Sequence, residues 1–203
     1  MNKKQLAVLL SRLEKLSLKN RALEQYETDP ELAAQILWHA SLHNDITNKV
    51  VADFGCGNGI FGIGALVLGA KKVYFIDVCD LSIAKKNVKH LGFRNASFLQ
   101  RDISNFSYKV DVVFQNPPFG VQKKHADKIF LERAFNLAQH IYSIHKIESK
   151  SFLEQISKEY CFHCKKLFTT NFLLKKSFPF HRKKAYPVLV GCWFFEKAKA
   201  LKK

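Results

Sequence analysis

Apolar and polar positions along the chain follow two different periods, one helical and one extended. Leucines recur every three or four residues over residues 3–18, which predicts a short amphipathic helix. A second helix is expected from Asp29 or Pro30 to about His43, with Asp29 as its N-cap and Pro30 in its first turn. The polar residues at 23–30 predict a turn-like connection before it.

From residue 49 onward, short apolar runs alternate with helical patterns of about ten residues. This alternation predicts a doubly wound α/β fold, with a Rossmann-like sheet that is mostly parallel. The last two strands are joined without a helix, so they can pair as an antiparallel hairpin at one edge of the sheet. Strands are expected at residues 49–54, 72–77, 97–102, 109–116, 141–145, 167–174 and 188–196, and helices at 59–69, 81–92, 125–139 and 149–160.

The length of 203 residues fits one domain. We divide it into an N-terminal helical extension, residues 1–45, and a Rossmann-like core, residues 46–203. No apolar run approaches the roughly 18 residues of a membrane helix, so we expect no membrane partner. The N-terminus is charged throughout, so a signal peptide is not expected either.

Basic residues dominate the charge of the chain, because 33 Lys and Arg against 17 Asp and Glu give a formal net charge of +16. They occur in pairs over the whole sequence, which indicates a basic surface on a folded domain rather than a basic tail. Such a surface favours a polyanionic partner such as nucleic acid. A solvated, lysine-rich surface without a partner is the alternative.

The five cysteines are odd in number and irregularly spaced, which favours a reducing, cytoplasmic setting. Only Cys161 and Cys164 have a metal-like spacing, and no second pair completes a zinc site. We therefore expect no metal in this chain, and we interpret these two residues as buried or half-exposed thiols. An isolated redox pair is the alternative.

The glycine-rich stretch DFGCGNG, residues 53–59, lies between a predicted strand and a predicted helix. The spacing of Gly57, Gly59 and Gly62 matches a dinucleotide site, in which a pyrophosphate lies at the helix N-terminus. The carboxylate of Asp53 would repel a pyrophosphate and would suit a cationic ligand. S-adenosylmethionine (SAM) carries an ammonium and a sulfonium group, so we expect SAM as the cofactor. A glycine-rich turn without a ligand is the alternative.

Two further acids follow the next two predicted strands. Asp77 ends the second strand and is placed to accept hydrogen bonds from the ribose hydroxyls of either cofactor. Asp102 follows the third strand and is placed to bind the adenine amino group. Ligands of doubly wound sheets bind at the carboxyl ends of the strands, where all these residues fall.

The tetrapeptide Asn116, Pro117, Pro118 and Phe119 follows the fourth strand. The prolines impose an extended backbone and remove two donors, which leaves the Asn116 side-chain oxygen and the Pro117 carbonyl as acceptors. Phe119 offers a flat face, so the site can hold a planar amine and direct its nitrogen lone pair toward a sulfonium methyl. Adenine, cytosine and guanine amines and glutamine amides all fit this description. A simple diproline turn is the alternative.

Several stretches together resemble the small-subunit ribosomal RNA adenine-N6 methyltransferases called methyltransferase-like five. They are LEQYETDPELAAQIL (23–37), NKVVADFGCGNGIFGIGALVLGA (48–70), QNPPFG (115–120), YSIHK (142–146) and FHRKKAYPV (180–188). The resemblance implies a seven-stranded class I methyltransferase sheet, SAM as cofactor, and Asn116 to Phe119 as the catalytic tetrapeptide. The positions that match the family's cofactor contacts are Gln25, Thr28, Gly55, Asn58, Ile60, Asp77 and Asp102.

The resemblance also implies a ribosomal RNA substrate and, often, a small zinc-binding activator protein that covers an apolar sheet edge. The sequence departs from the family at one place, because Tyr26 is followed by Glu27 and Thr28 where the usual stretch has Pro-Thr.

The basic segment between the last two strands contains cations among aromatic residues, as in proteins that bind single-stranded RNA. Its cations are His181, Arg182, Lys183 and Lys184. Lys123 and Lys124, just past the tetrapeptide, would border the same entrance and hold the phosphates that flank an unpaired or flipped-out adenine. An exposed hairpin loop with solvated charges is the alternative.

These observations predict a SAM-dependent methyltransferase acting on adenine N6 in small-subunit ribosomal RNA. One alternative is a glutamine-amide methyltransferase of the same fold, although such enzymes usually carry an extra helical N-terminal domain. The other is a catalytically silent RNA-binding assembly factor. The presence of Asp53, Asp77 and Asn116 argues against that loss of activity.

Overall fold

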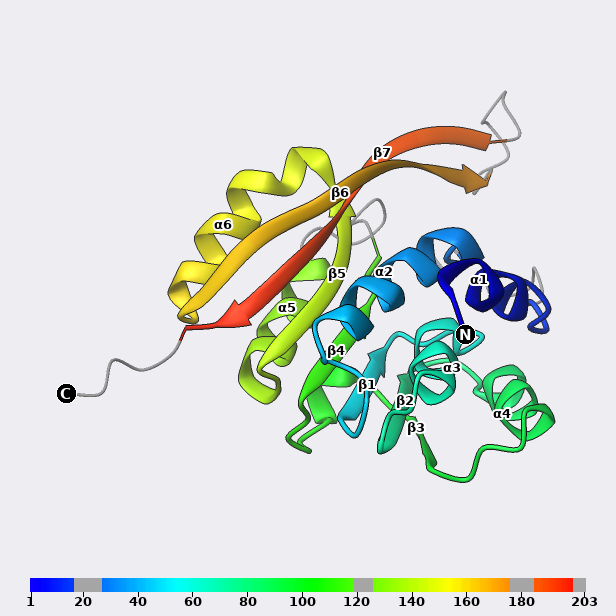
Figure 1. Cartoon of the computed structure of the whole chain (residues 1–203). Helices are drawn as coiled ribbons and strands as arrows, with labels where there is room; N and C mark the ends of the chain where they lie inside the picture. The colour runs from blue at the N-terminus through cyan, green and yellow to red at the C-terminus, as the bar shows by residue number, and fades with distance from the viewer. Residues whose placement is uncertain (17–26, 119–125, 176–184, 199–203) are drawn as a thin grey trace.

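The computed structural model describes residues 1–16, 27–118, 126–175 and 185–198. Their strands form one seven-stranded sheet in the order β3-β2-β1-β4-β5-β7-β6 (Figure 1). Five strands are parallel: β1 (Val50–Phe54), β2 (Lys72–Asp77), β3 (Ala96–Gln100), β4 (Val112–Gln115) and β5 (His140–Lys146). The antiparallel pair is β6 (Phe162–Lys175) and β7 (Ala185–Lys197), which confirms the predicted fold class.

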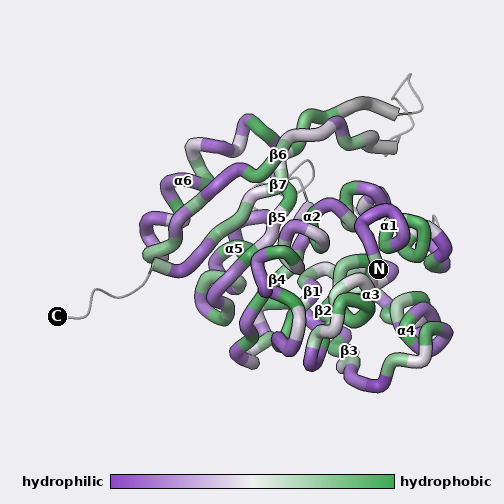
Figure 2. The backbone as a smooth tube through the Cα atoms, viewed as in Figure 1, coloured by the Kyte–Doolittle hydropathy of each residue, from purple (hydrophilic) through white to green (hydrophobic). Residues whose placement is uncertain are grey.

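Helices cover both faces of the sheet, because alternate strand residues point to opposite sides. One face carries α1 (Lys3–Ser11), α2 (Pro30–Leu42), α3 (Ile60–Val67) and α4 (Ser82–His90). The other carries α5 (Ala126–Leu137) and α6 (Lys150–Glu159). Figure 2 shows α3 apolar along its length, whereas α6 alternates between polar and apolar residues. No described helix is long and apolar enough to cross a membrane.

Helix α3 packs unusually close to its neighbours because two of its residues are glycines. A Cβ atom on Gly62 would lie 2.3 Å from the Phe75 ring of β2, and one on Gly64 would lie 2.3 Å from the Leu37 side chain of α2. Gly62 is the third glycine of the dinucleotide-like pattern. Its presence is therefore explained by helix–strand packing, a role that the third glycine of a dinucleotide site also has, so Gly62 does not distinguish the two cofactors.

The expected extent of the first helix was wrong. The leucine period predicts a helix over residues 3–18, but α1 ends at Ser11 with Arg12 as its C-cap. The backbone of Glu14 is hydrogen-bonded to the side chain of Asn87 instead, so tertiary contacts override the local pattern. Strands β6 and β7 are also longer than predicted.

The interpretation of the two spaced cysteines as buried or half-exposed thiols holds for Cys164 only. Cys161 is exposed because it lies in the turn after α6, with a φ of 59°. Burial raises the pKa of the Cys164 thiol to about 12. Both thiols are free.

Candidate functional site

The turn between β1 and α3, residues 55–59, lies at the carboxyl edge of the sheet. Gly55, Gly57 and Gly59 have φ angles of 65°, 55° and 87°, a region that glycine adopts without strain. The Gly55 N–H donates to the Ile76 carbonyl at 2.8 Å, which fixes the turn against β2. A Cβ atom on Gly57 would lie 3.3 Å from the Leu16 side chain. The positive φ angles and the close approach of Leu16 therefore favour glycine in this turn, and internal hydrogen bonds of its N–H groups hold it in place.

The two acids at the ends of β1 and β2 both organise this turn. Asp77 accepts from the Gly57 N–H and the Cys79 N–H, each at 2.9 Å, one with each carboxylate oxygen. Each oxygen retains capacity for a further donor, such as a ribose hydroxyl. Asp53 is buried and accepts from the Gly62 N–H at 2.8 Å, and burial raises its pKa well above the usual range. Asp53 therefore ties β1 to the first turn of α3, and its contact with the cofactor stays a prediction.

Residues 12–16, which we call the strap, lie against the glycine-rich turn. Asn87 on α4 accepts from the Glu14 N–H at 2.8 Å and donates to the carbonyls of Glu14 and Asn58, both at 3.1 Å. The Asn58 side chain also donates to the Glu14 carbonyl at 3.4 Å. Asn58 thus binds the strap with its side chain. Asn87 is a site residue that the sequence reasoning missed, and the signal was an asparagine on the inward face of a helix.

Glu27, the residue that departs from the family pattern, has a defined role here. Its carboxylate accepts a hydrogen bond from the Leu16 N–H at 2.5 Å, which joins the end of the strap to the segment that precedes α2. The neighbouring Gln25, predicted to contact the cofactor, lies outside the described residues.

Asn116 has a buried acceptor that no described residue uses. Its Nδ2 donates to the Thr28 Oγ1 at 3.1 Å, so Thr28 fixes which way the amide points. The Asn116 Oδ1 is buried and accepts no hydrogen bond from any described residue. A buried carbonyl oxygen without a donor is rare in folded proteins and calls for an explanation. Pro117 is buried beside it, whereas Phe119, Lys123 and Lys124 lie outside the described residues.

The remaining predicted cofactor residues lie at the same edge of the sheet. Asp102 is exposed and accepts from the Ser104 N–H at 2.8 Å, where it caps a short 3-10 helix. Ile60 is buried at the start of α3. Val78, which the sequence reasoning missed, directly follows Asp77 and is 52% exposed. An apolar side chain exposed beside an acid that is predicted to bind ribose is suited to contact a base.

A nucleoside cofactor suits this edge of the sheet. Asp77 ends β2 beside the glycine turn, and each of its carboxylate oxygens retains capacity for a further donor. SAM would be held by the glycine turn and by Asp77. The fold and the site therefore define a SAM-dependent methyltransferase with a Rossmann-like sheet.

Comparison with known proteins identifies the family. The model of the methyltransferase small domain matches residues 28–143. The chain is 34% identical to the rRNA N(6)-adenosine-methyltransferase METTL5 of Danio rerio, over 83% of this chain and 86% of that one. The crystal structure of a proposed RNA methyltransferase from Pyrococcus horikoshii superposes with a TM-score of 0.89 at 38% identity, over 98% of this chain and 99% of that one. The chain therefore belongs to the methyltransferase small domain family and, within it, to the family of METTL5.

A further similarity is confined to part of the chain. The ribosomal protein L11 methyltransferase of Psychrobacter cryohalolentis is 37% identical over 90 residues, which is 38% of this chain and 29% of that protein. The expected enzyme class and the expected SAM cofactor are both confirmed by the family. The roles of individual site residues stay predictions.

Proposed function

We propose that the protein transfers the SAM methyl group to the N6 amino group of an unpaired or flipped-out adenine in small-subunit ribosomal RNA. The observation that carries this proposal is the unused Oδ1 of Asn116, a buried acceptor at the carboxyl edge of the sheet. An adenine amino group is a planar donor with two N–H bonds, and one of them would satisfy this oxygen. The similarity to METTL5 supports adenine and ribosomal RNA as the substrate class.

The same geometry explains how the reaction would proceed. With one amino hydrogen on the Asn116 Oδ1 and the other on the Pro117 carbonyl, the nitrogen lone pair points away from both acceptors. SAM, when bound, would supply an electrophilic methyl on a sulfonium, and sulfur would keep the electron pair of the broken carbon–sulfur bond. The methylated amine would release one proton to water. Positioning supplies most of the acceleration, so no charged base is required.

The register of the sheet places an extended hairpin beside this site. Strand β5 ends with the pair Lys146–Val190, at the same edge as Asn116. Strands β6 and β7 continue to pair beyond that point, from Asn171–Leu189 to Lys175–Ala185. We call this extension, residues 171–175 and 185–189, the arm. At about 3.4 Å per residue, its five residues per strand correspond to roughly 17 Å. Figure 1 shows β6 and β7 continuing past the end of β5.

The arm supports an RNA substrate because a basic segment of the sequence joins its two strands. His181, Arg182, Lys183 and Lys184 connect its two strands in the sequence and lie outside the described residues. A basic hairpin that begins at the catalytic edge is suited to hold the phosphates on one side of a flipped-out base. We propose that these residues, with Lys123 and Lys124, bind the RNA backbone. The small zinc-binding activator of the family is a further proposed partner.

A labelling experiment tests the proposal. The purified protein is incubated with methyl-labelled SAM and, separately, with small-subunit rRNA, large-subunit rRNA or protein extract, with and without an activator. We expect label in small-subunit rRNA, released as N6-methyladenosine. The variant Asn116→Ala is assayed alongside and should lose methyl transfer. Asn136→Ala, which changes an exposed asparagine on α5, is its matched control.

The other outcomes identify the alternatives. Label in protein would replace the proposal with a glutamine-amide methyltransferase. Label in large-subunit rRNA alone would support RNA methylation but contradict the small subunit as the substrate. An absence of label from every sample with the activator supplied would favour a catalytically silent RNA-binding factor.

A further inference from the structure

A buried polar network lies directly behind Asn116, on the other face of the sheet. Gln115, the last residue of β4, is fully buried and donates from Nε2 to the Ser143 Oγ of β5 at 3.0 Å. The Ser143 Oγ lies 2.6 Å from the His145 Nε2. His145 has only 2% of its side chain exposed. Three polar side chains are therefore connected in the protein interior, immediately next to the predicted catalytic residue.

The other ring nitrogen of His145 connects the network to α5. The His145 Nδ1 lies 3.7 Å from the Asp127 Oδ2, and the Asp127 side chain is 20% exposed. Asp127 is in the first turn of α5. The chain between Gln115 and Asp127, residues 116–126, carries the whole predicted catalytic tetrapeptide. One imidazole therefore connects to the residues on both sides of that segment.

The donors and acceptors select one neutral form of His145. The Asp127 carboxylate only accepts, so the Nδ1 must carry the ring proton. The Gln115 amide donates to Ser143, so the Ser143 hydroxyl hydrogen is available for the His145 Nε2. Burial lowers the pKa of His145, opposed by its contacts with Asp127, so the ring is neutral near pH 7. Asp127 is the one charged group that acts on the ring among the described residues.

Protonation of His145 would reverse this chain of hydrogen bonds. A proton on Nε2 would make the ring donate to the Ser143 Oγ, and the hydroxyl hydrogen would turn toward Gln115. The Ser143 Oγ can accept from both Gln115 and the protonated ring, but its own hydrogen then needs another acceptor, and the Gln115 Oε1 accepts no hydrogen bond from the described residues. The charge of His145 therefore sets the direction of the Ser143 hydroxyl, and through it acts on Gln115.

We propose that His145 is a positioning residue for methyl transfer, which in its neutral form fixes Gln115 and Asp127 and thereby the placement of Asn116 between them. The proposal rests on the proposed function, because it names a residue that serves the same site from behind. His145 is buried, so it does not contact the substrate or the cofactor directly. It acts through Gln115 and Asp127, which lie on either side of the segment that carries the tetrapeptide.

The test compares two histidines of one strand. We expect His145→Ala to lower kcat about 10- to 100-fold, because a displacement of about 1 Å at a reacting group has effects of this size. SAM affinity should stay within about twofold. His140→Ala removes a histidine at the other end of β5, where it contacts Asp45, and should leave kcat of the folded protein unchanged. Thermal unfolding of both variants is measured alongside, so that kcat refers to folded protein.

Conservative variants and pH separate positioning from simple packing. His145→Asn retains a donor for Asp127 and His145→Gln retains a partner for Ser143, so each should recover part of kcat. Because burial lowers the pKa of His145 from its usual value, kcat of the wild-type enzyme should fall only on the acid side of that usual value as His145 is protonated, and this decrease should be absent in His145→Gln. Unchanged kcat with a lowered melting temperature would reduce His145 to a packing role and overturn the proposal.

One measurement does not depend on the substrate. Amide hydrogen exchange over residues 111–118 should become faster in His145→Ala and not in His140→Ala. If the wild-type protein labels no substrate, the proposed function fails and the exchange result alone decides the role of His145. If the wild type is active and neither kcat nor exchange responds to His145→Ala, only the inference about His145 fails.

Discussion

At the amino edge of the sheet, Asp45 accepts from the His140 Nδ1 at 2.6 Å and from the Tyr142 hydroxyl at 2.7 Å. Asp111 at the same edge accepts from the Val50 N–H at 2.7 Å. At the carboxyl edge, two successive residues, Gln115 and Asn116, each bury an amide oxygen that accepts nothing from the described residues. Both edges hold buried polar side chains at strand ends. Gln115 and Asn116 thus leave acceptor capacity unused among the described residues, whereas Asp45 and Asp111 use theirs within the fold. The buried His39 Nδ1 and Trp193 Nε1 also lack a partner among the described residues.

The largest expected effect is at the carboxyl edge. Asn116→Ala removes the unused acceptor, and we expect methyl transfer to fall by about 10³-fold, the size found when one preorganised hydrogen-bonding group is removed. SAM affinity, measured by calorimetry, should stay within about twofold. Normal turnover in this variant would remove the tetrapeptide from the mechanism.

Removal of a carboxylate at the amino edge should lower the stability of the fold and leave turnover unchanged. Asp45→Ala leaves the buried Tyr142 hydroxyl and the His140 ring without their acceptor, so the free energy of unfolding should fall by about 3–5 kcal/mol. The kcat of the remaining folded protein should not change. Urea unfolding and activity at low temperature measure the two quantities, and a selective loss of kcat would contradict the division between the edges.

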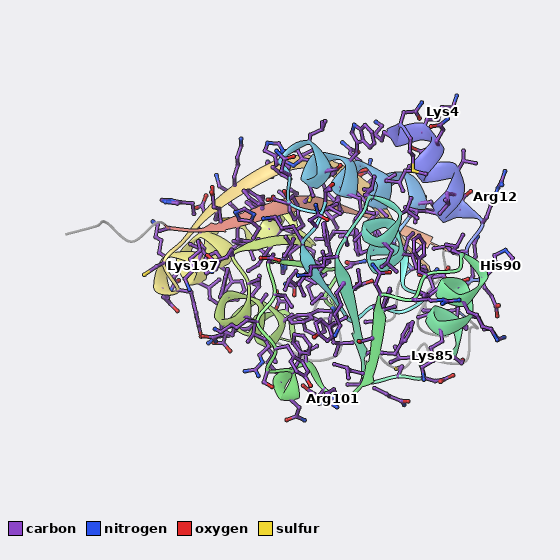
Figure 3. The ribbon with its side chains drawn as sticks, turned by 60° about the horizontal axis from the view of Figure 1, so that its bottom comes forward. Lys4, Arg12, Lys85, His90, Arg101 and Lys197 are labelled. Carbon is purple, nitrogen blue, oxygen red and sulfur yellow. The ribbon has the colours of Figure 1, made fainter. Side chains whose placement is uncertain are left out.

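The two ends of the β6–β7 hairpin offer a third comparison. Lys183→Glu with Lys184→Glu changes the segment beyond the arm, and the salt dependence of RNA binding should become shallower by about two in slope. Lys158→Glu with Lys197→Glu makes the same charge change elsewhere. Figure 3 shows Lys197 on the opposite side of the molecule from Lys85 and His90. An equal loss of slope in both pairs would indicate nonspecific attraction to a basic protein.

The strap next to the glycine turn should affect the cofactor more moderately. Asn87→Ala removes three hydrogen bonds that join the strap to the turn, and SAM binding should weaken about tenfold. Lys86→Ala is the control, because it breaks only the exposed ion pair between Lys86 and Glu14 and should change the dissociation constant less than about twofold. Equal weakening of SAM binding in the two variants would mean that the Lys86–Glu14 ion pair holds the strap as strongly as Asn87 does.

The smallest expected effect is a pH dependence of stability. The hydrogen bond to Asp45 raises the pKa of His140, and burial opposes it less strongly. A raised folded-state pKa means that this contribution is complete below the unfolded value near 6.5 and is lost as the pH rises through the folded value. The loss of stability in His140→Gln should therefore be larger at pH 5.5 than at pH 9, as measured by urea unfolding. A difference that grows toward high pH would be inconsistent with this sign.

Sequence reasoning placed several candidate site residues at one edge of the sheet because they lie at strand ends. The carboxyl ends of parallel strands meet at one edge, so Gly55, Asp77 and Asn116 come together once the strands are recognised. Reasoning from the sequence did not find Asn87, because an asparagine within a helix is ordinarily a surface residue. The first helix was predicted too long, because its leucines continue the helical period after the backbone has left the helix at Ser11.

The sequence by itself determined the order of strands and helices along the chain and the glycine turn, because period and turn residues act locally; the catalytic role of the tetrapeptide stays a prediction. Only the tertiary structure decided that Thr28 fixes the Asn116 amide and that His145 connects Gln115 to Asp127. It also set the register that carries the arm past β5. Hydrogen bonds between residues far apart in the chain depend on how strands and helices pack, and local sequence patterns do not encode that packing.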